Sequence, residues 1–316
     1  MIPMTSKRLL LVVACTALGA LLCCSPPDVR LGMGPGDGVR LAYRVLGTGR
    51  PLVVIHDGPG YEKSIMYKGF DDLKSEMKVI YYDQRGCGAS EPLALTTPSG
   101  IADNVDDLEA LRRYFHFDKM SLAAHGWGAV IALEYARTYP ARVEAIILIT
   151  PLSPFAPYTK LERLMDKVPD PARQQIVGAL NNSGFSVLDR QETVMRAVLP
   201  ALFYKQDAAR AIKWDGLKYA PDVSLRLGAD LTSLDLFAVL AEITQRTLVV
   251  VGRHDISIPV RDQMAYADGI ANASAVVFND SGHFPFLEEH AFFMNLVKEF
   301  LLEKTVPALA KGGQLP

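Results

Sequence analysis

Cysteine is scarce in this 316-residue sequence, and it is unevenly placed. Three of the four cysteines, Cys15, Cys23 and Cys24, lie within the first 24 residues, which leaves Cys87 alone in the remainder. A single cysteine has no partner within its own chain. The sequence therefore excludes an internal disulfide after residue 24. With 49% hydrophobic residues, the chain is instead rich enough in apolar side chains to bury a large core.

The sequence also lacks a basic segment. It has 33 Lys and Arg against 35 Asp and Glu, a formal charge of -2, and no run in which basic and aromatic residues alternate. Proteins that bind nucleic acid usually carry a basic patch or stripe. A nucleic-acid partner is therefore not expected.

Long apolar runs are missing except at the N-terminus. The run from Leu9 to Leu22 follows two basic residues and ends at a pair of cysteines. It is shorter than the about 20 apolar residues that a membrane-spanning helix needs. A charged start before a run of this length is typical of an export signal, which we predict for residues 1–24.

The end of this signal resembles that of a bacterial lipoprotein, with Cys24, or Cys23 as the alternative, as the lipidated residue. It departs from that pattern because the residue before the modified cysteine is usually Gly, Ala or Ser, and here it is Cys23. An uncleaved anchor and ordinary secretion are the alternatives. We expect an exported protein, periplasmic or held at the membrane by its lipid, with secretion as the alternative.

Short β-rich runs alternate with helical stretches through most of the remaining chain, which predicts a mostly parallel central sheet with helices on both faces. The expected strands are residues 39–45, 52–55, 78–82, a strand that begins at 121, 143–149, 247–251 and 275–278. The expected helices are residues 101–115, 129–139, 260–267 and 289–302. At 316 residues, the length fits one large α/β domain with an insertion as well as it fits two domains.

The segment 150–240 interrupts this alternation. Strand patterns vanish there, and prolines and amphipathic helical runs dominate. About 90 residues are too many for a loop. We therefore expect a helical cap inserted between two strands, so that residues 25–149 and 241–304 are the two parts of the core. Residues 305–316 are expected to be a disordered tail.

The stretch 121–128 has the pattern of a nucleophile elbow. A short apolar strand leads through a glycine-containing turn into a helix that begins near Ala129. Such an elbow reads small-x-nucleophile-x-small, because the strained turn leaves no room for larger side chains two positions to either side. Ala124 and Gly128 are the small residues. The nucleophile position is then Gly126, which has no side chain.

Four further motifs flank this elbow in a fixed order. They are His56-Asp57-Gly58-Pro59-Gly60, Asp83-Gln84-Arg85-Gly86-Cys87-Gly88, Gly252-Arg253-His254-Asp255 and Ser281-Gly282-His283. This set resembles the α/β-hydrolase superfamily, and within it the proline iminopeptidase branch, over roughly residues 38–303. The resemblance implies an α/β-hydrolase fold with an inserted cap. It also implies hydrolysis of peptide N-termini or of small esters and amides, without a cofactor or a metal.

The same resemblance assigns the site residues. The acid falls on Asp255 and the base on His283, which in an active member takes the proton of the nucleophile while the acid orients the imidazole. The oxyanion hole would consist of the backbone N–H of Trp127 and of one donor from the 56–60 loop, with Gly58 as the expected residue. The motif at 83–88 is interpreted as scaffold, and Cys87 as a scaffold residue rather than a surrogate nucleophile.

Two positions depart from the family pattern. Gly126 cannot start a Ser-His-Asp mechanism, so serine-type chemistry is predicted to be lost or strongly reduced, and Gly126→Ser is expected to restore measurable activity. An engineered knockout is the alternative to natural loss. Members generally carry Gly where this chain has Asp57, which we interpret as a solvated turn residue in a left-handed conformation.

The cap is expected to select the ligand. Iminopeptidases are expected to grip a free amino terminus with cap carboxylates, and the aromatic-acidic pair Trp214 and Asp215 is the expected lining. Two hypotheses follow. The protein is a family hydrolase whose activity is vestigial or arises by an unusual route, or it is a non-catalytic protein that binds a small-molecule or peptide ligand, or a partner, through the pocket or the cap surface.

Overall fold

The computed structural model describes residues 29–94, 96–155 and 164–302. The predicted export signal (1–24) and the predicted tail (305–316) lie outside these residues. Nowhere in the described ranges is there a helix that is both long enough and apolar enough to cross a membrane.

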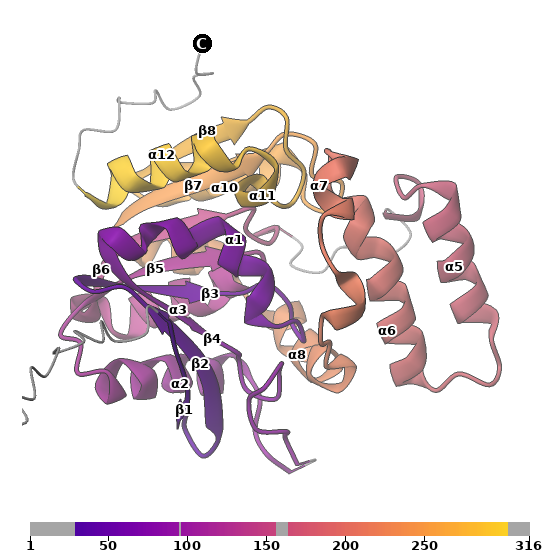
Figure 1. The fold of residues 1–316 in the computed structure, drawn as a ribbon, viewed down its shortest axis with the longest axis horizontal. Coiled ribbons are helices and arrows are strands. Elements are labelled where there is room, and N and C mark those ends of the chain that lie inside the picture. The colour runs from indigo at the N-terminus through magenta and orange to yellow at the C-terminus, as the bar shows by residue number, and fades with distance from the viewer. Residues whose placement is uncertain (1–28, 95, 156–163, 303–316) are drawn as a thin grey trace, which may run out of the picture.

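A mostly parallel sheet organises the described chain (Figure 1). Its strands are β1 (Val29–Pro35), β2 (Arg40–Leu46), β3 (Arg50–Ile55), β4 (Met77–Tyr82), β5 (Met120–His125), β6 (Val143–Ile149), β7 (Arg246–Gly252) and β8 (Ala273–Phe278). They lie in the order β1-β2-β4-β3-β5-β6-β7-β8, with β2 antiparallel to both neighbours and the other pairs parallel. Strand β1 was not expected, because two glycines and a proline obscure its pattern.

Helices cover both faces of this sheet. One face packs against α2 (Ile101–Tyr114), α3 (Gly128–Thr138) and α10 (Val260–Gly269), and the other against α1 (Tyr67–Phe70) and α12 (His290–Leu301). The central strands are almost continuously apolar because neither face meets water. Short helical turns complete the framework: α11 (Pro285–Glu288) and 3-10 turns at Lys63–Met66, Asp71–Ser75, Pro140–Arg142, Leu199–Leu202 and Trp214–Gly216.

The described residues between β6 and β7 form helices. They are α5 (Asp170–Asn181), α6 (Val187–Val198), α7 (Gln206–Arg210), α8 (Pro221–Ser233) and α9 (Leu236–Glu242). Figure 1 shows α5 to α8 beside one end of the sheet. By contrast, α9 packs against α3 and α10, and it buries Leu236 and Leu240 in the core cluster of those helices. It therefore belongs to the packing of the sheet rather than to the layer that covers its end.

The loops that bear the family motifs meet at one edge of the sheet. They follow strands β3, β4, β5, β7 and β8, which all run in the same direction in the parallel part of the sheet. Because the carboxyl ends of parallel strands share an edge, residues far apart in the sequence converge there. This edge faces helices α6 and α8.

Candidate active site

The turn between β5 and α3 has the backbone of a nucleophile elbow. Gly126 adopts a φ of 51°, in the left-handed region that glycine enters without strain. Two positions later, a Cβ on Gly128 would lie 2.8 Å from the backbone oxygen of His56. The turn therefore requires a residue without a side chain at 128. At the nucleophile position itself, Gly126 offers no reactive atom.

The carboxylate of Asp57 fills the space beside Gly126. A Cβ built on Gly126 would lie 2.0 Å from Asp57 Oδ1, far closer than two atoms can approach. The same Oδ1 accepts a hydrogen bond from the backbone N–H of Trp127 at 2.7 Å, and Oδ2 lies 3.1 Å from Nε2 of His283. Asp57 thus contacts both the expected oxyanion donor and the expected base.

This placement corrects the interpretation of Asp57 as a solvated turn residue. The residue is buried, with 8% of its surface exposed. Among the described non-glycine residues, only His116 and Thr150 have a positive φ, so Asp57 is not left-handed. A buried carboxylate needs partners, and the Trp127 amide and His283 supply them.

The acid and the base meet as the family pattern implies. His283 Nδ1 lies 2.7 Å from Asp255 Oδ2. The other carboxylate oxygen of Asp255 accepts the backbone N–H groups of Ser257 and Ile258 and the Ser257 hydroxyl. Because these bonds hold the carboxylate, they also fix the orientation of the imidazole. The backbone N–H of His283 donates to Leu202 at 2.9 Å, which ties the loop to the inserted segment.

The three charged groups form a buried chain, Asp255, His283 and Asp57. Burial disfavours the charged form of each, but their mutual attraction is stronger. For His283, burial lowers the pKa, while Asp255 and Asp57 raise it to about 10 in sum. For Asp57, burial raises the pKa, while His283 and the Trp127 amide lower it to about 2. At neutral pH the site therefore holds an imidazolium between two carboxylates.

The motif at 83–88 holds the loops of the site in place. Gln84 accepts the indole N–H of Trp127 at 2.7 Å and donates to the His56 carbonyl at 2.7 Å, so it joins the elbow to the 56–60 loop. Arg85 makes two 2.8 Å bonds to Asp107. Cys87, at 1% exposure, does not line the cavity beside His283, and burial raises the pKa of its thiol. These contacts are those of a scaffold.

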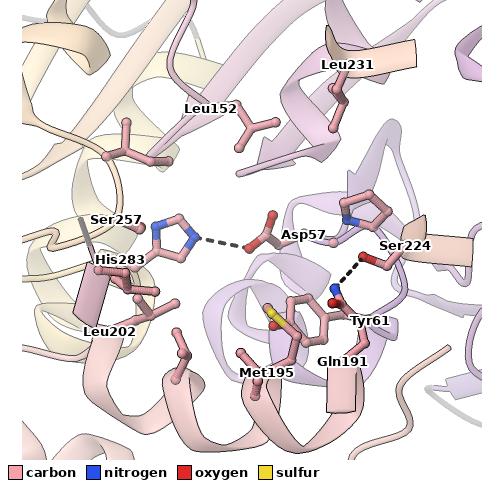
Figure 2. A pocket seen from close by; sticks show the side chains of 16 residues that line it. Asp57, Tyr61, Leu152, Gln191, Met195, Leu202, Ser224, Leu231, Ser257 and His283 are labelled. Atoms are coloured by element: carbon pink, nitrogen blue, oxygen red, sulfur yellow. Dashed lines mark hydrogen bonds and ion pairs between the residues drawn. The ribbon is translucent and has the colours of Figure 1, made fainter. Parts of the chain in front are cut away.

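A cavity of about 290 Å³ opens beside Asp57 and His283 (Figure 2). Its wall is mainly apolar: Pro59, Leu152, Leu164, Val194, Met195, Val198, Leu202, Leu231 and Ile258. The remaining described lining residues are Asp57, Gly58, Tyr61, Gln191, Ser224, Ser257 and His283. Among these, Asp57 is the only carboxylate. The cavity thus favours a neutral, mainly apolar ligand over a charged amine.

The predicted lining by Trp214 and Asp215 is wrong for this cavity. Trp214 packs edge-on against Phe203 and donates its indole N–H to the Ala209 carbonyl at 3.0 Å. Asp215 is exposed. Both belong to the packing and surface of the inserted helices, and α6 and α8 supply the lining instead. The pair alone does not tell a cavity wall from helix packing, because an aromatic ring can bury itself against a neighbouring helix while the adjacent acid stays in water.

The comparisons with known proteins agree with this geometry. A family model described as alpha/beta hydrolase fold matches residues 50–290, which is more than half of the chain. This chain belongs to the α/β-hydrolase family. The predicted fold class is confirmed by this match and by the solved structures described below.

Known relatives place this α/β-hydrolase near the proline iminopeptidases. It is 26% identical over 276 residues to the proline iminopeptidase of Saccharolobus solfataricus, covering 82% of this chain and 87% of that protein. It is 25% identical over 285 residues to the AB hydrolase superfamily protein YclE of Bacillus subtilis, covering 86% and 99%. The predicted likeness to the proline iminopeptidase branch is confirmed.

Solved structures share the fold. An esterase from Thermogutta terrifontis superposes with a TM-score of 0.67 at 20% identity, covering 87% of this chain and 99% of that one. An alpha/beta fold family hydrolase from Bacillus anthracis gives a TM-score of 0.68 at 22% identity, covering 88% and 99%. At these identities the likeness concerns the fold alone.

One group of side chains in this α/β-hydrolase has the chemistry of a metal site. Asp57, His125 and His283 each offer one atom within 4.8 Å of the others. His125 donates its Nε2–H to the His283 carbonyl at 2.8 Å, and its Nδ1 has no partner among the described residues. Asp57 and His283 already share a proton directly, however, where a metal would have to bind. The expectation of no metal stays a prediction.

Three site residues escaped the sequence-based prediction in part or in full. Asp57 was noticed as a departure but was placed in solvent, while Tyr61 and His125 were not singled out. A signal for Asp57 did exist, because both departures from the family motifs fall in the two loops that form one active site. Because one departure removes a side chain and the other adds one, the two together suggest that both positions border the same space.

Proposed function

We propose that this α/β-hydrolase binds a neutral, mainly apolar small molecule beside His283, and that serine-type hydrolysis of peptide N-termini and esters is lost or strongly reduced. The observation that carries the second part is the 2.0 Å distance from Asp57 Oδ1 to a Cβ built on Gly126. A serine and this carboxylate cannot occupy their places together.

The position of Asp57 supports loss of the oxyanion site as well. In serine-type hydrolysis, negative charge develops on the substrate oxygen that the Trp127 amide must receive. Here that amide is bonded to a carboxylate, 2.7 Å away. A second negative charge would be repelled there. Removal of a triad member alone lowers rates on the order of 10⁴ to 10⁶-fold in well-studied enzymes, and this obstruction adds to that loss.

The lining of the cavity supports the neutral ligand. No described lining residue other than Asp57 is a carboxylate, and Asp57 is already paired with His283. Two carboxylates of the inserted segment have partners away from the cavity. Glu192 pairs with Arg196, and Asp207 pairs with Arg210. An amino terminus would therefore find no unshared carboxylate among the described lining residues.

A set of four proteins tests the proposed loss. Native protein, Gly126→Ser, Asp57→Gly and the double variant are assayed on a proline arylamide and on short p-nitrophenyl esters. We expect the double variant to exceed the native rate by at least about 100-fold, because it regains the nucleophile and frees the oxyanion amide. The sequence alone predicts measurable activity for Gly126→Ser, but the position of Asp57 changes this expectation: the single variant should stay near the native rate, because Asp57 still obstructs the site.

His283→Ala in the double-variant background is the control, and it should abolish the gain. Native turnover comparable to that of the double variant would contradict the proposal. Equal activity of Gly126→Ser and the double variant would show that Asp57 does not obstruct the site.

A further inference from the structure

Asp57 contacts both the expected base and the expected oxyanion donor of the elbow. One oxygen accepts the Trp127 N–H at 2.7 Å, and the other faces His283 Nε2 at 3.1 Å. Figure 2 shows this carboxylate inside the cavity, pointing toward His283 and surrounded by apolar lining residues such as Leu152. An ionised group in this place is a potential nucleophile.

We propose that Asp57 is a relocated nucleophile and that this protein hydrates neutral, mainly apolar epoxides to diols. The proposal rests on the apolar cavity of the proposed function, and it does not depend on the loss of serine chemistry. In the first step, Asp57 Oδ2 attacks a ring carbon and the ring carbon–oxygen bond breaks. The ring oxygen takes a proton from Tyr61, which leaves a hydroxyalkyl ester on Asp57.

A carboxylate is suited to this electrophile and not to an acyl group. Its attack on an ester or amide carbonyl would give an anhydride, and the alcohol or amine released in that step would readily attack the anhydride and re-form the substrate. Its attack on a saturated carbon of a strained ring gives an ordinary ester. The carbonyl oxygen of that ester is Oδ1, which already lies 2.7 Å from the Trp127 N–H. The Trp127 amide cannot receive the oxyanion of an ester or amide substrate, but it is already bonded to the oxygen that becomes the oxyanion when the Asp57 ester is hydrolysed.

Tyr61 is placed to supply the proton for ring opening. It lines the cavity at 5% exposure, and its hydroxyl has no hydrogen-bond partner among the described residues. A buried hydroxyl of this kind is uncommon in folded proteins, and an epoxide oxygen would satisfy it. Burial, together with Tyr219 and the Asp57 carboxylate, raises the pKa of Tyr61, so the donor is protonated at neutral pH.

His283 becomes a base after the ester forms, because it then loses its extra proton. In the resting site it is an imidazolium between Asp57 and Asp255. Ester formation neutralises Asp57, so one of the two charges that hold the proton disappears. The imidazolium then returns a proton to the Tyr61 phenolate and becomes a base.

Hydrolysis of the ester restores the starting state. Neutral His283 takes a proton from water, which attacks the carbonyl carbon of the Asp57 ester. The resulting oxyanion on Oδ1 is held by the Trp127 amide. When it collapses, the bond from the carbonyl carbon to the ester oxygen breaks, and the proton of the added hydroxyl passes to that oxygen. The diol leaves, Asp57 is again a carboxylate, and His283 keeps the proton it took from water. The sum is epoxide plus water giving diol, with no further reactant.

Single-turnover labelling tests the proposal. Full-length native protein in excess over styrene oxide is incubated in water enriched in oxygen-18. We expect the first-turnover diol to carry ordinary oxygen from Asp57, and the heavy oxygen to appear in the tryptic peptide that contains Asp57. His283→Gln should accumulate the ester as a mass adduct on that peptide, because attack by water then lacks its base.

Two further variants separate the roles. Tyr61→Phe should slow formation of the adduct on the order of 10²-fold, the usual contribution of a general acid, without preventing it. Asp57→Asn is nearly isosteric and should give neither adduct nor diol, while circular dichroism reports whether it folds. Cys87→Ser, which changes a buried thiol away from the cavity, should leave the labelling unchanged.

The contrary results are distinct from one another. Heavy oxygen in the first-turnover diol would overturn the proposal in favour of direct attack by water. Loss of activity on chelation with recovery on adding Zn²⁺ would overturn it in favour of a metal at Asp57, His125 and His283. Absence of adduct and diol would overturn it too. If styrene oxide still bound and the ester assays stayed silent, the proposed function would stand without it.

Discussion

At the scale of single residues, the site depends on two substitutions that share one space. Asp57 reaches into the place where a side chain at 126 would lie, and Gly126 leaves that place open. Either change alone would give a clash or a void. The pair also creates a buried ion chain with His283 and Asp255 that a serine-containing site would not have.

This ion chain predicts a pH dependence of stability. The pKa of His283 is raised from 6.5 to about 10, so its contribution is complete below pH 6.5 and is lost as the pH rises through 10. The pKa of Asp57 is lowered from 3.8 to about 2, so its contribution is complete above pH 3.8 and is lost as the pH falls through 2.

Asp57→Asn should therefore flatten the alkaline side of the curve. Without one carboxylate, the pKa of His283 falls, and the decline in the free energy of unfolding between pH 6.5 and 10 becomes smaller. At pH 7 we expect a loss of about 1.5 to 3 kcal/mol, the range for hydrogen bonds to charged groups. Urea unfolding from pH 5 to 10 measures both effects. Superimposable native and variant profiles would contradict them.

At the scale of elements, glycines bring three loops into backbone contact. A Cβ on Gly252, at the end of β7, would lie 1.9 Å from the carbonyl oxygen of Gly282. A Cβ on Gly282 would lie 2.3 Å from the carbonyl oxygen of Leu202. These contacts set the distance between the loop of Asp255 and the loop of His283. The geometry of the Asp255–His283 pair therefore depends on the absence of side chains at Gly252 and Gly282.

Gly252→Ala is expected to destabilise the protein by at least about 2 kcal/mol, because the added methyl group meets rigid backbone. Gly178→Ala is the matched control. Gly178 lies exposed in α5, and its Cβ would meet no atom within 4 Å. It should stabilise the protein by about 0.5 to 1 kcal/mol, because alanine favours a helix. Urea unfolding compares the two, and a loss no greater in Gly252→Ala than in the control would count against this packing.

At the scale of the whole molecule, the cavity lies between the sheet edge and the inserted helices. Asp57 and His283 come from the two parts of the core, whereas Gln191 and Ser224 come from α6 and α8. The core thus supplies the charged groups, and the insertion supplies most of the apolar wall. We further propose that this domain is exported and held at a membrane by a lipid on Cys24, on the strength of the sequence before residue 25.

Metabolic labelling of the full-length chain with a palmitate analogue tests the anchor. In a bacterial host we expect label on the native protein and none on Cys24→Ala, because the lipid is attached at that cysteine. Cys87→Ala should retain the label, since the Cys87 thiol is buried. An unlabelled native protein, or label that persists in Cys24→Ala, would rule out Cys24 as the attachment site.

Much of this architecture was predictable from local patterns. The alternation of strand and helix, the elbow and the two motifs bearing Asp255 and His283 each occupy a short stretch, and periodicity and turn chemistry act over that range. Strand β1 was not predictable in this way. Its glycines and proline are poor strand formers, and it is a strand because β2 offers it partners.

The sequence by itself determined the fold, the order of the motifs and the absence of a side chain at Gly126. Only the tertiary structure decided that Asp57 takes the vacant place, that α6 and α8 line the cavity, and that a serine at 126 would collide. The physical reason is that these contacts join residues far apart in the sequence. Asp57 and Trp127 are 70 residues apart and bond at 2.7 Å, so their contact depends on how β3 and β5 pair, which no local pattern records.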